Sequence, residues 1–290
     1  FKLEKHVVQR RHKLLEDGGV TFRLNCDIGT DISFDEIREA HDAVLVATGV
    51  YKARDISAPG IGMGGIVPAL DYLTASNRKS LGDEVADFDS GLLNAEGRDV
   101  VVIGGGDTAM DCVRTAIRQK ANSVTCLYRR DRANMPGSQR EVANAEEEGV
   151  DFRWLSAPQA FLGDNHVRAV QAQKIHLGQP DATGRQVPQI IEDSSHEIPA
   201  DLVIKALGFD PEDIPTMFGA PELEVSKWGT IGVDWRTMMT NLPGVFAAGD
   251  IVRGASLVVW GVRDGRDAAE SIHSYIMAQS EAPRLSLIHI

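Results

Sequence analysis

The sequence predicts an α/β fold built around a strand, a glycine turn, a helix and a second strand. Val100–Ile103 is an apolar run of strand length, and Gly104–Gly106 follow it directly. Apolar residues then recur at the spacing of one buried helical face, at Ala109, Cys112, Val113, Ala116 and Ile117. Ser123–Tyr128 has the character of a second strand, so the whole segment is interpreted as a βαβ unit.

The glycine turn of this unit has the spacing of a nucleotide-binding loop. Gly104, Gly106 and Ala109 fit the pattern G-x-G-x-x-G/A. In that pattern the first glycine allows a tight turn, the second admits a pyrophosphate, and the third position lets helix and strand pack closely. The start of the following helix offers free N–H groups and the positive end of the helix dipole to a phosphate. A glycine turn in an unrelated α/β protein is the alternative interpretation.

The residues after the second strand indicate which dinucleotide is bound. Sites for NAD usually place a carboxylate roughly 20 residues past the glycine turn, where it holds the ribose 2′-OH, whereas NADP sites have arginine there. Here Arg129, Arg130 and Arg132 surround Asp131. Guanidinium groups bind a 2′-phosphate through paired, charge-assisted hydrogen bonds, so we expect NADPH. The alternative is a solvated basic loop in which Asp131 is a surface partner of the arginines.

The composition is that of a soluble globular protein, and 290 residues allow two domains of ordinary size. The net charge of −12 argues against nucleic acid as the main partner, and no apolar run reaches the length of a membrane span. Three scattered cysteines, Cys26, Cys112 and Cys126, fit neither a disulfide framework nor a metal site and favour a reducing, cytoplasmic setting. None of the eight histidines has a metal-like or catalytic spacing.

The chain before the βαβ unit is predicted to alternate short elements with glycine-rich connections. The expected elements are a charged helix over 2–19, a strand over 20–29, a short helix over 33–37, a buried strand over 43–49, a Gly/Pro-rich crossover over 51–67, a helix over 68–75 and a polar connector to Gly97. The chain starts at Phe1, and we expect it to be a fragment.

The chain beyond the basic residues is predicted to return to strands and to close with a helix. Ser138 and Glu141 form the S-x-x-E pattern of a capping box, for a helix that ends at Gly149. The elements expected next are antiparallel strands over 150–155 and 166–177, a polar loop over 179–195, a buried strand over 200–211, a strand and turn over 244–250 and a helix over 257–277. We expect the apolar tail, 285–290, to be foreign to the fold.

These elements resemble the flavoproteins with two dinucleotide-binding domains, in which an NAD(P)H domain is inserted into an FAD domain. AVLVATG (43–49) matches the strand before the crossover into the inserted domain, and GVFAAGD (244–250) matches the strand whose aspartate contacts the FAD ribityl chain. The strings GGGDTAMDCVRTA, VTCLYRRDRANMPGSQREVANAEEEGV, ADLVIKALGF and GVFAAGDIVRGASLVV are together very similar to the small (beta) subunit of NADPH-dependent glutamate synthase and its close relatives. Trp260 departs from that family, which usually has a small residue there.

The resemblance implies a Rossmann-like NADPH domain with a three-layer β-meander over 98–233. This domain would be inserted in a partial FAD-binding domain made of 1–66 and 234–284, with 67–97 as the crossover. The implied NADPH-binding residues are Gly104, Gly105, Gly106, Asp107, Thr108, Ala109, Arg129, Arg130 and Gly208. The implied FAD-binding residues are Thr48, Gly49, Gly249, Asp250, Gly254, Ala255 and Ser256. From the residues alone, a strand-ending glycine at 208 and a simple turn aspartate at 250 remain alternatives.

The resemblance also implies that hydride passes from NADPH to FAD, with no catalytic acid or base and no metal ligand in this chain. In the family, a cysteine-rich region that lies before the part resembled by Phe1–Met277 holds iron–sulfur clusters. Electrons leave through these clusters and reach the large (alpha) subunit, where glutamate is made. One alternative is a sibling module that feeds another acceptor, such as a ferredoxin or a pyrimidine- or sulfur-reducing partner. The other is a nucleotide-binding fragment without catalytic activity.

Overall fold

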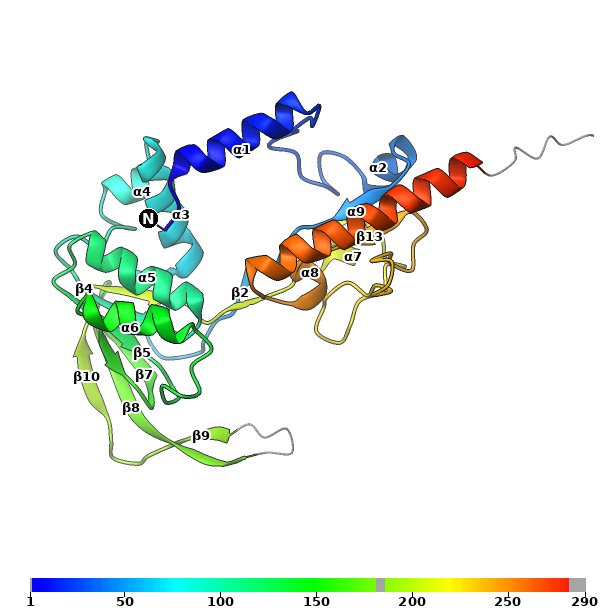
Figure 1. Ribbon diagram of the computed structural model, residues 1–290. Helices are drawn as coiled ribbons and strands as arrows, with labels where there is room; N and C mark the ends of the chain where they lie inside the picture. The colour runs from blue at the N-terminus through cyan, green and yellow to red at the C-terminus, as the bar shows by residue number, and fades with distance from the viewer. Residues whose placement is uncertain (1, 181–185, 282–290) are drawn as a thin grey trace, which may run out of the picture. The chain divides into compact units, whose positions relative to one another are not determined.

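Residues 2–180 and 186–281 are described by the computed structural model, and their contacts divide the chain into two units (Figure 1). Unit 1 comprises Phe1–His12 and Ala53–Gly208, and unit 2 comprises Lys13–Lys52 and Phe209–Ile290. The expected cofactor-binding domains stay a prediction, and the contacts group 53–97 with unit 1 and 209–233 with unit 2. The reason is packing: the expected crossover supplies a strand to the sheet of unit 1, whereas 209–233 contributes side chains to the core of unit 2. The expected foreign tail, 285–290, lies outside the described residues.

Unit 1 is centred on a parallel sheet of five strands. Their order is β3 (Ile66–Pro68), β11 (Leu202–Lys205), β4 (Asp99–Ile103), β5 (Ser123–Leu127) and β6 (Asp151–Arg153). The last four residues of β4 and of β5 are buried, because both faces of the sheet are covered. This explains why these strands have continuous apolar sequences.

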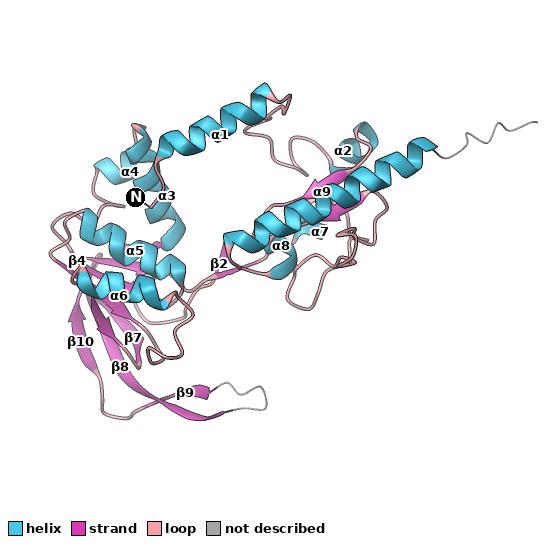
Figure 2. Ribbon diagram, viewed as in Figure 1, coloured by secondary structure: helices cyan, strands magenta, loops and turns pink. Residues whose placement is uncertain are grey.

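Helices cover one face of this sheet and a second sheet covers the other (Figure 2). The helices are α3 (Ala69–Leu81), α4 (Ala86–Asp89), α5 (Asp107–Arg118) and α6 (Gln139–Glu147). The second sheet is antiparallel and contains β7 (Ser156–Gly163), β8 (Val167–Pro180), β9 (Gln186–Ile190) and β10 (His196–Pro199). Alternate residues of β4 face the two layers, since Val100 and Val102 pack with the helices while Val101 and Ile103 pack with the second sheet. The predicted three layers and the buried face of α5 are therefore confirmed.

One strand prediction and one loop prediction in this region were wrong. The segment 150–155 was expected to pair antiparallel with 166–177, but its strand β6 is parallel to β5, and β8 pairs with β7, β9 and β10. Only Leu155, at the end of the segment, meets β8, where its carbonyl accepts the Ile175 N–H at 2.7 Å. The physical reason is connectivity, because β6 follows the crossover helix α6 and such a crossover returns the chain parallel to the preceding strand. The expected polar loop, 179–195, also contains strand β9, which pairs with β8.

The predicted capping box of α6 was also wrong. Ser138 is the residue before the helix, but its side chain makes no capping hydrogen bond. The Glu141 carboxylate lies 2.6 Å from the Arg114 guanidinium instead, and Glu148 binds the same guanidinium at 2.6 Å. These ion pairs join α6 to α5. The short helix expected over 33–37 does form, as α2 (Phe34–Ala40), and Ser33 and Glu36 make its capping box.

Unit 2 has a parallel pair of strands, β1 (Val44–Val46) and β13 (Val245–Ala247), with Val44 opposite Val245. Its helices are α2, α7 (Ile214–Met217), α8 (Asp250–Arg253) and α9 (Val258–Glu281), and α1 (Lys5–Asp17) begins in unit 1 and ends in unit 2. Short strands β2 (Lys52–Ala53) and β12 (Phe209–Asp210) pair where the chain passes between the units.

The strand expected over 20–29 does not form. Val20, Phe22 and Leu24 alternate as a strand would, yet they are 47, 39 and 74 % exposed. A strand needs a neighbour for its backbone hydrogen bonds, and no strand of the described chain pairs with this segment. Across the described residues, no helix combines the length and apolar character needed to cross a membrane.

Candidate functional site

The glycine turn lies at the carboxyl end of β4, in the middle of the unit 1 sheet. The Gly104 N–H donates to the carbonyl of Leu127, at the end of β5, over 3.2 Å. The Ala206 N–H, just beyond β11, donates to the carbonyl of Ile103 over 2.8 Å. The ends of three neighbouring strands therefore meet at this turn. In open α/β sheets, ligands bind at such carboxyl ends.

The three glycines have different surroundings. Gly104 has φ +151°, and a Cβ there would overlap the carbonyl oxygen of Ala206. A Cβ at Gly105 would overlap the ring of Tyr128, so the fold itself requires both glycines. A Cβ at Gly106 would meet no atom of the described chain within 4 Å. In the G-x-G-x-x-G/A pattern, the second glycine leaves room for a pyrophosphate. The open side of Gly106 fits that group.

Helix α5 begins at this open space. The Gly106 carbonyl accepts the N–H groups of Ala109 and Met110, at 2.9 and 3.2 Å. The N–H groups of Asp107 and Thr108 therefore have no acceptor within the helix and can bind an anion. The Asp107 carboxylate accepts the Ser138 N–H at 3.0 Å, so this side chain holds the segment 131–138 beside the glycine turn.

The basic residues follow β5 and lie next to the glycine turn, because the Tyr128 ring covers Gly105. Arg129 is exposed, and its guanidinium has no acceptor among the described residues. Arg130 is half-buried, and its Nη2 donates to the carbonyl of Gln186 in β9 over 3.4 Å. Asp131 accepts two hydrogen bonds from Asn134 and, within the described chain, forms no ion pair with either arginine. Arg129 is thus the guanidinium most available to a phosphate.

Gly208 follows β11, the strand on the other side of β4. It has φ +90°, and its carbonyl accepts the N–H of Arg54 at 3.0 Å. The structure thus places every implied NADPH-binding residue after one of three adjacent strands, β11, β4 and β5.

The implied FAD-binding residues lie in unit 2, after its two parallel strands. Thr48 and Gly49 follow β1, and Gly249 and Asp250 follow β13. The Ala248 N–H donates to the carbonyl of Val46 at 3.1 Å, so the two strand ends are adjacent. Both glycines have positive φ, +74° and +78°, which a side chain would disfavour. The two turns therefore lie side by side at the carboxyl ends of the two strands.

The segment 250–256 is closed by its own hydrogen bonds. The Asp250 carboxylate accepts the Ser256 N–H at 3.2 Å and the Ser256 hydroxyl at 2.8 Å, both through Oδ1. The Gly254 N–H donates to the Asp250 carbonyl at 2.7 Å. Only Oδ2 of Asp250 is left, within the described chain, to accept a ligand hydroxyl.

Arg253, within this segment, packs against two tryptophan rings, and no sequence motif predicted this arrangement. Arg253 binds both oxygens of Asp264, at 2.6 and 2.7 Å, and Asp264 is only 1 % exposed. The guanidinium carbon lies 4.8 Å from the centroid of the Trp235 ring and 5.0 Å from that of Trp260. The carboxylate of Asp264 raises the pKa of Arg253 through these hydrogen bonds. Trp260, the departure from the resembled family, therefore packs against Arg253.

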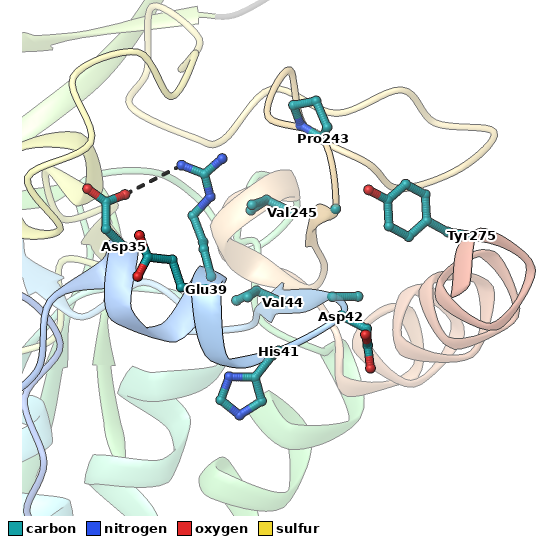
Figure 3. Close-up of a pocket in the computed structure, with 11 residues that line it drawn as sticks. Asp35, Glu39, His41, Asp42, Val44, Pro243, Val245 and Tyr275 are labelled. Atoms are coloured by element: carbon teal, nitrogen blue, oxygen red, sulfur yellow. Dashed lines mark ion pairs between the residues drawn. The ribbon is translucent and has the colours of Figure 1, made fainter. Parts of the chain in front are cut away.

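A pocket of about 380 Å³ lies at the opposite end of the unit 2 strands (Figure 3). Val44 and Val245, the first residues of β1 and β13, line it, together with Asp35 and Arg38, which form an ion pair at 3.5 Å. It is therefore separate from the turns at 48–49 and 249–250, which follow the last residues of these strands.

Two of the three cysteines, Cys112 and Cys126, are buried and unreactive. Burial raises the pKa of the Cys126 thiol to about 12 and also raises that of Cys112, so both stay protonated. The Cys126 thiol donates to the Gly104 carbonyl over 3.4 Å, beneath the glycine turn. No group of three or more candidate metal ligands occurs in the described part of the chain.

Comparisons with known proteins agree with this fold. Residues 16–282 match the family model described as pyridine nucleotide-disulphide oxidoreductase. The chain is 68 % identical over 283 residues to the glutamate synthase [NADPH] small chain of Azospirillum brasilense, with 98 % of this chain and 59 % of the relative covered. It is 43 % identical over 286 residues to the putative oxidoreductase AegA of Escherichia coli, with 97 and 43 % covered. The resemblance to the glutamate synthase small subunit is confirmed, although the chain spans only about three fifths of that relative.

Solved structures show the same fold. Mycobacterium tuberculosis FprA in complex with NADPH superposes with a TM-score of 0.72 at 17 % identity, covering 96 % of this chain and 73 % of FprA. Lactococcus lactis thioredoxin reductase gives 0.58 at 23 % identity, covering 81 and 66 %. At these identities the similarity establishes the fold alone.

Proposed function

The chain belongs to the pyridine nucleotide-disulphide oxidoreductase family, and from this premise we propose that it is an NADPH-oxidising flavoprotein module. The observation that carries the proposal is the glycine turn of unit 1. There the open side of Gly106 and the first N–H groups of α5 lie at one strand end, and the exposed Arg129 follows the next. This combination suits a dinucleotide whose pyrophosphate and 2′-phosphate are both anionic.

Each group in unit 1 has a role in this proposal. The N–H groups around Gly105, Gly106, Asp107, Thr108 and Ala109 would hold the pyrophosphate. Arg129 would bind the 2′-phosphate directly, and Arg130 would add positive charge while held by the Gln186 carbonyl. Gly104 shapes the turn, and Gly208 leaves the neighbouring strand end clear of a side chain.

The turns of unit 2 would hold FAD. Thr48, Gly49 and Gly249 bring backbone close to the ligand, and Oδ2 of Asp250 would accept a ribityl hydroxyl. Of Gly254, Ala255 and Ser256, expected to present N–H groups to the electron-rich end of the flavin, Gly254 and Ser256 donate theirs to Asp250. The Ala255 N–H is therefore the donor that this segment would present. When both cofactors are bound, they supply hydride transfer from nicotinamide to flavin, and the protein needs no acid or base of its own.

We extend the proposal to the whole protein through its relatives. The name of the Azospirillum relative supports a small subunit of glutamate synthase that supplies electrons to a large (alpha) subunit for glutamate synthesis. Iron–sulfur clusters would belong to sequence outside the 290 residues, because three scattered cysteines cannot form such a site. The free thiols of the chain agree with a reducing, cytoplasmic location. The similarity to AegA favours the second candidate, a sibling module with another acceptor.

The cofactor preference tests the proposal. Replacing Arg129 and Arg130 together by Glu should shift the steady-state preference of the full-length protein from NADPH toward NADH, because carboxylates repel a 2′-phosphate and accept the ribose hydroxyls. Arg140→Glu is the control, since Arg140 is exposed and pairs with no acidic group in the described chain. An unchanged preference in the double variant would reject the assignment. Glutamate formation with the large subunit then separates the two candidate functions.

A further inference from the structure

Asp131 is the acidic residue among the arginines of 129–132, and its carboxylate bonds to a residue of its own loop. Its Oδ1 accepts the backbone N–H of Asn134 and the side-chain Nδ2 of Asn134, each at 2.8 Å. The Asp131 carboxylate therefore points into a turn of the chain. A carboxylate at this place along the sequence is what NAD-type sites use to hold the ribose 2′-OH, so its orientation bears on which dinucleotide binds.

Asn134 is held in place independently of Asp131. The Tyr128 hydroxyl donates to the Asn134 backbone carbonyl at 3.1 Å, and the same Tyr128 ring covers Gly105 of the glycine turn. The next residue, Met135, is buried, and its N–H donates to the Arg132 carbonyl at 3.2 Å. The backbone at 134 is thus fixed against the site, whereas the Asn134 side chain is exposed and contributes the Nδ2 bond to Asp131.

A carboxylate free to turn toward Arg129 would have two effects on the ligand. It would repel a 2′-phosphate dianion and compete with it for the guanidinium. It would also accept the 2′-OH of a dinucleotide that lacks the phosphate. Both effects lower the preference for the phosphorylated ligand, and the two hydrogen bonds from Asn134 oppose both.

We propose that Asn134 is a positioning residue that sets dinucleotide specificity, because it holds the Asp131 carboxylate away from the 2′-phosphate of the ligand. This inference rests on the proposed NADPH site of unit 1. It assigns to Asn134 a role that requires no contact between Asn134 and the ligand.

The test compares binding of 2′,5′-ADP and 5′-AMP, two probes that differ only in the 2′-phosphate, by isothermal titration calorimetry on the 290-residue chain. Asn134→Ala removes the Nδ2 bond to Asp131 and keeps the backbone N–H bond, so it should lower the ratio of the two affinities severalfold, through weaker binding of 2′,5′-ADP. Asn134→Leu keeps side-chain bulk, removes the donor and should give the same ratio. In an Asp131→Asn background, Asn134→Ala should leave the ratio unchanged, because there is no carboxylate to release.

The outcomes separate the inference from the function on which it rests. If the unaltered chain prefers 2′,5′-ADP but Asn134→Ala and Asn134→Leu keep that preference, the inference is wrong and the NADPH site stands. If Asn134→Ala lowers the ratio equally in the Asp131→Asn background, the loss comes from loop packing and the inference is again wrong. If the unaltered chain shows no preference for 2′,5′-ADP, the proposed NADPH site itself fails, and the inference with it.

Discussion

Alanine substitutions at Gly104 and Gly106 should have opposite consequences, although the two residues are separated by one position. Gly106 has φ −89°, which any residue adopts, and an added methyl group meets nothing within 4 Å in the described chain. Gly106→Ala should therefore cost only the preference of a helix N-cap for glycine over alanine, about 1 kcal/mol or less. The same methyl group fills the space in which the pyrophosphate would lie. We expect NADPH affinity to fall at least tenfold, equivalent to about 1.4 kcal/mol.

Gly104→Ala should instead damage the fold. Its φ of +151° is disfavoured for alanine, at a cost of about 1–3 kcal/mol. The new methyl group would also overlap the Ala206 carbonyl oxygen, which belongs to backbone beside a central strand and cannot move aside alone. The total loss of unfolding free energy should exceed that of Gly106→Ala clearly.

Urea unfolding and NADPH titration of the two variants measure both effects. Gly106→Ala should separate them, with near-normal stability and weakened binding. A Gly106→Ala chain that is folded and binds NADPH with unaltered affinity would show that the pyrophosphate does not lie at this turn. A Gly104→Ala chain of normal stability would show that the first glycine is not required by the Ala206 backbone.

Three further predictions follow from the charges, thiols and turns. Glu148→Gln should lower the unfolding free energy by about 3 kcal/mol, because hydrogen bonds from Arg118 and Arg114 lower the pKa of Glu148 from 4.5 to about 2. Urea unfolding measures this change. Glu147→Gln is the control and should change the unfolding free energy little, since Glu147 is exposed. Since that pKa is depressed in the folded state, the stabilisation is present above about pH 4.5 and disappears as the pH falls toward 2, and a flat stability profile there would contradict it. Ellman's reagent should titrate Cys26 rapidly and reach Cys112 and Cys126 only after denaturation, so three fast thiols in the native chain would disprove their burial. The purified 290-residue chain should retain FAD weakly, because the residues proposed to bind FAD lie at the carboxyl ends of a two-stranded sheet alone, and a stoichiometric yellow flavin after dialysis would refute this.

The parts predicted correctly from the sequence are those encoded by local periodicity. The buried face of α5, with Ala109, Cys112 and Val113, follows from a 3.6-residue repeat, and the position of Gly104 follows from the end of an apolar run. Pairing is not local, which is why the segment 150–155 received the wrong partner. The apolar pattern identifies a strand but cannot say which neighbour it joins.

Side-chain competition explains the other differences. Glu141 had the right spacing for a capping box but found a stronger partner in Arg114, 27 residues away. Arg253 and Asp264 lie on different helices, α8 and α9, so no periodicity within one element could pair them. The bond between Asp131 and Asn134 did have a local signal, since an aspartate commonly accepts hydrogen bonds from residues two or three positions later in a turn.

The two sets of turns differ in how they are held, and this has a consequence for binding. The glycine turn of unit 1 is fixed by backbone from other segments, since Leu127 accepts from Gly104 and Gly137 donates to the Gly105 carbonyl at 2.9 Å. The segment 250–256 of unit 2 is also held from outside, since the Ile231 N–H donates to the Ile251 carbonyl at 2.9 Å and Arg253 binds Asp264. Its two ends, however, are joined through the Asp250 carboxylate, the same group that would accept a ligand hydroxyl. A ligand at the glycine turn therefore meets a preformed site. A ligand at Asp250 must share the carboxylate with Ser256. Replacing Ser256 therefore changes both the conformation of the turn and the hydrogen bonding of the Asp250 carboxylate. Only a comparison of ligands with and without the hydroxyl separates these two effects.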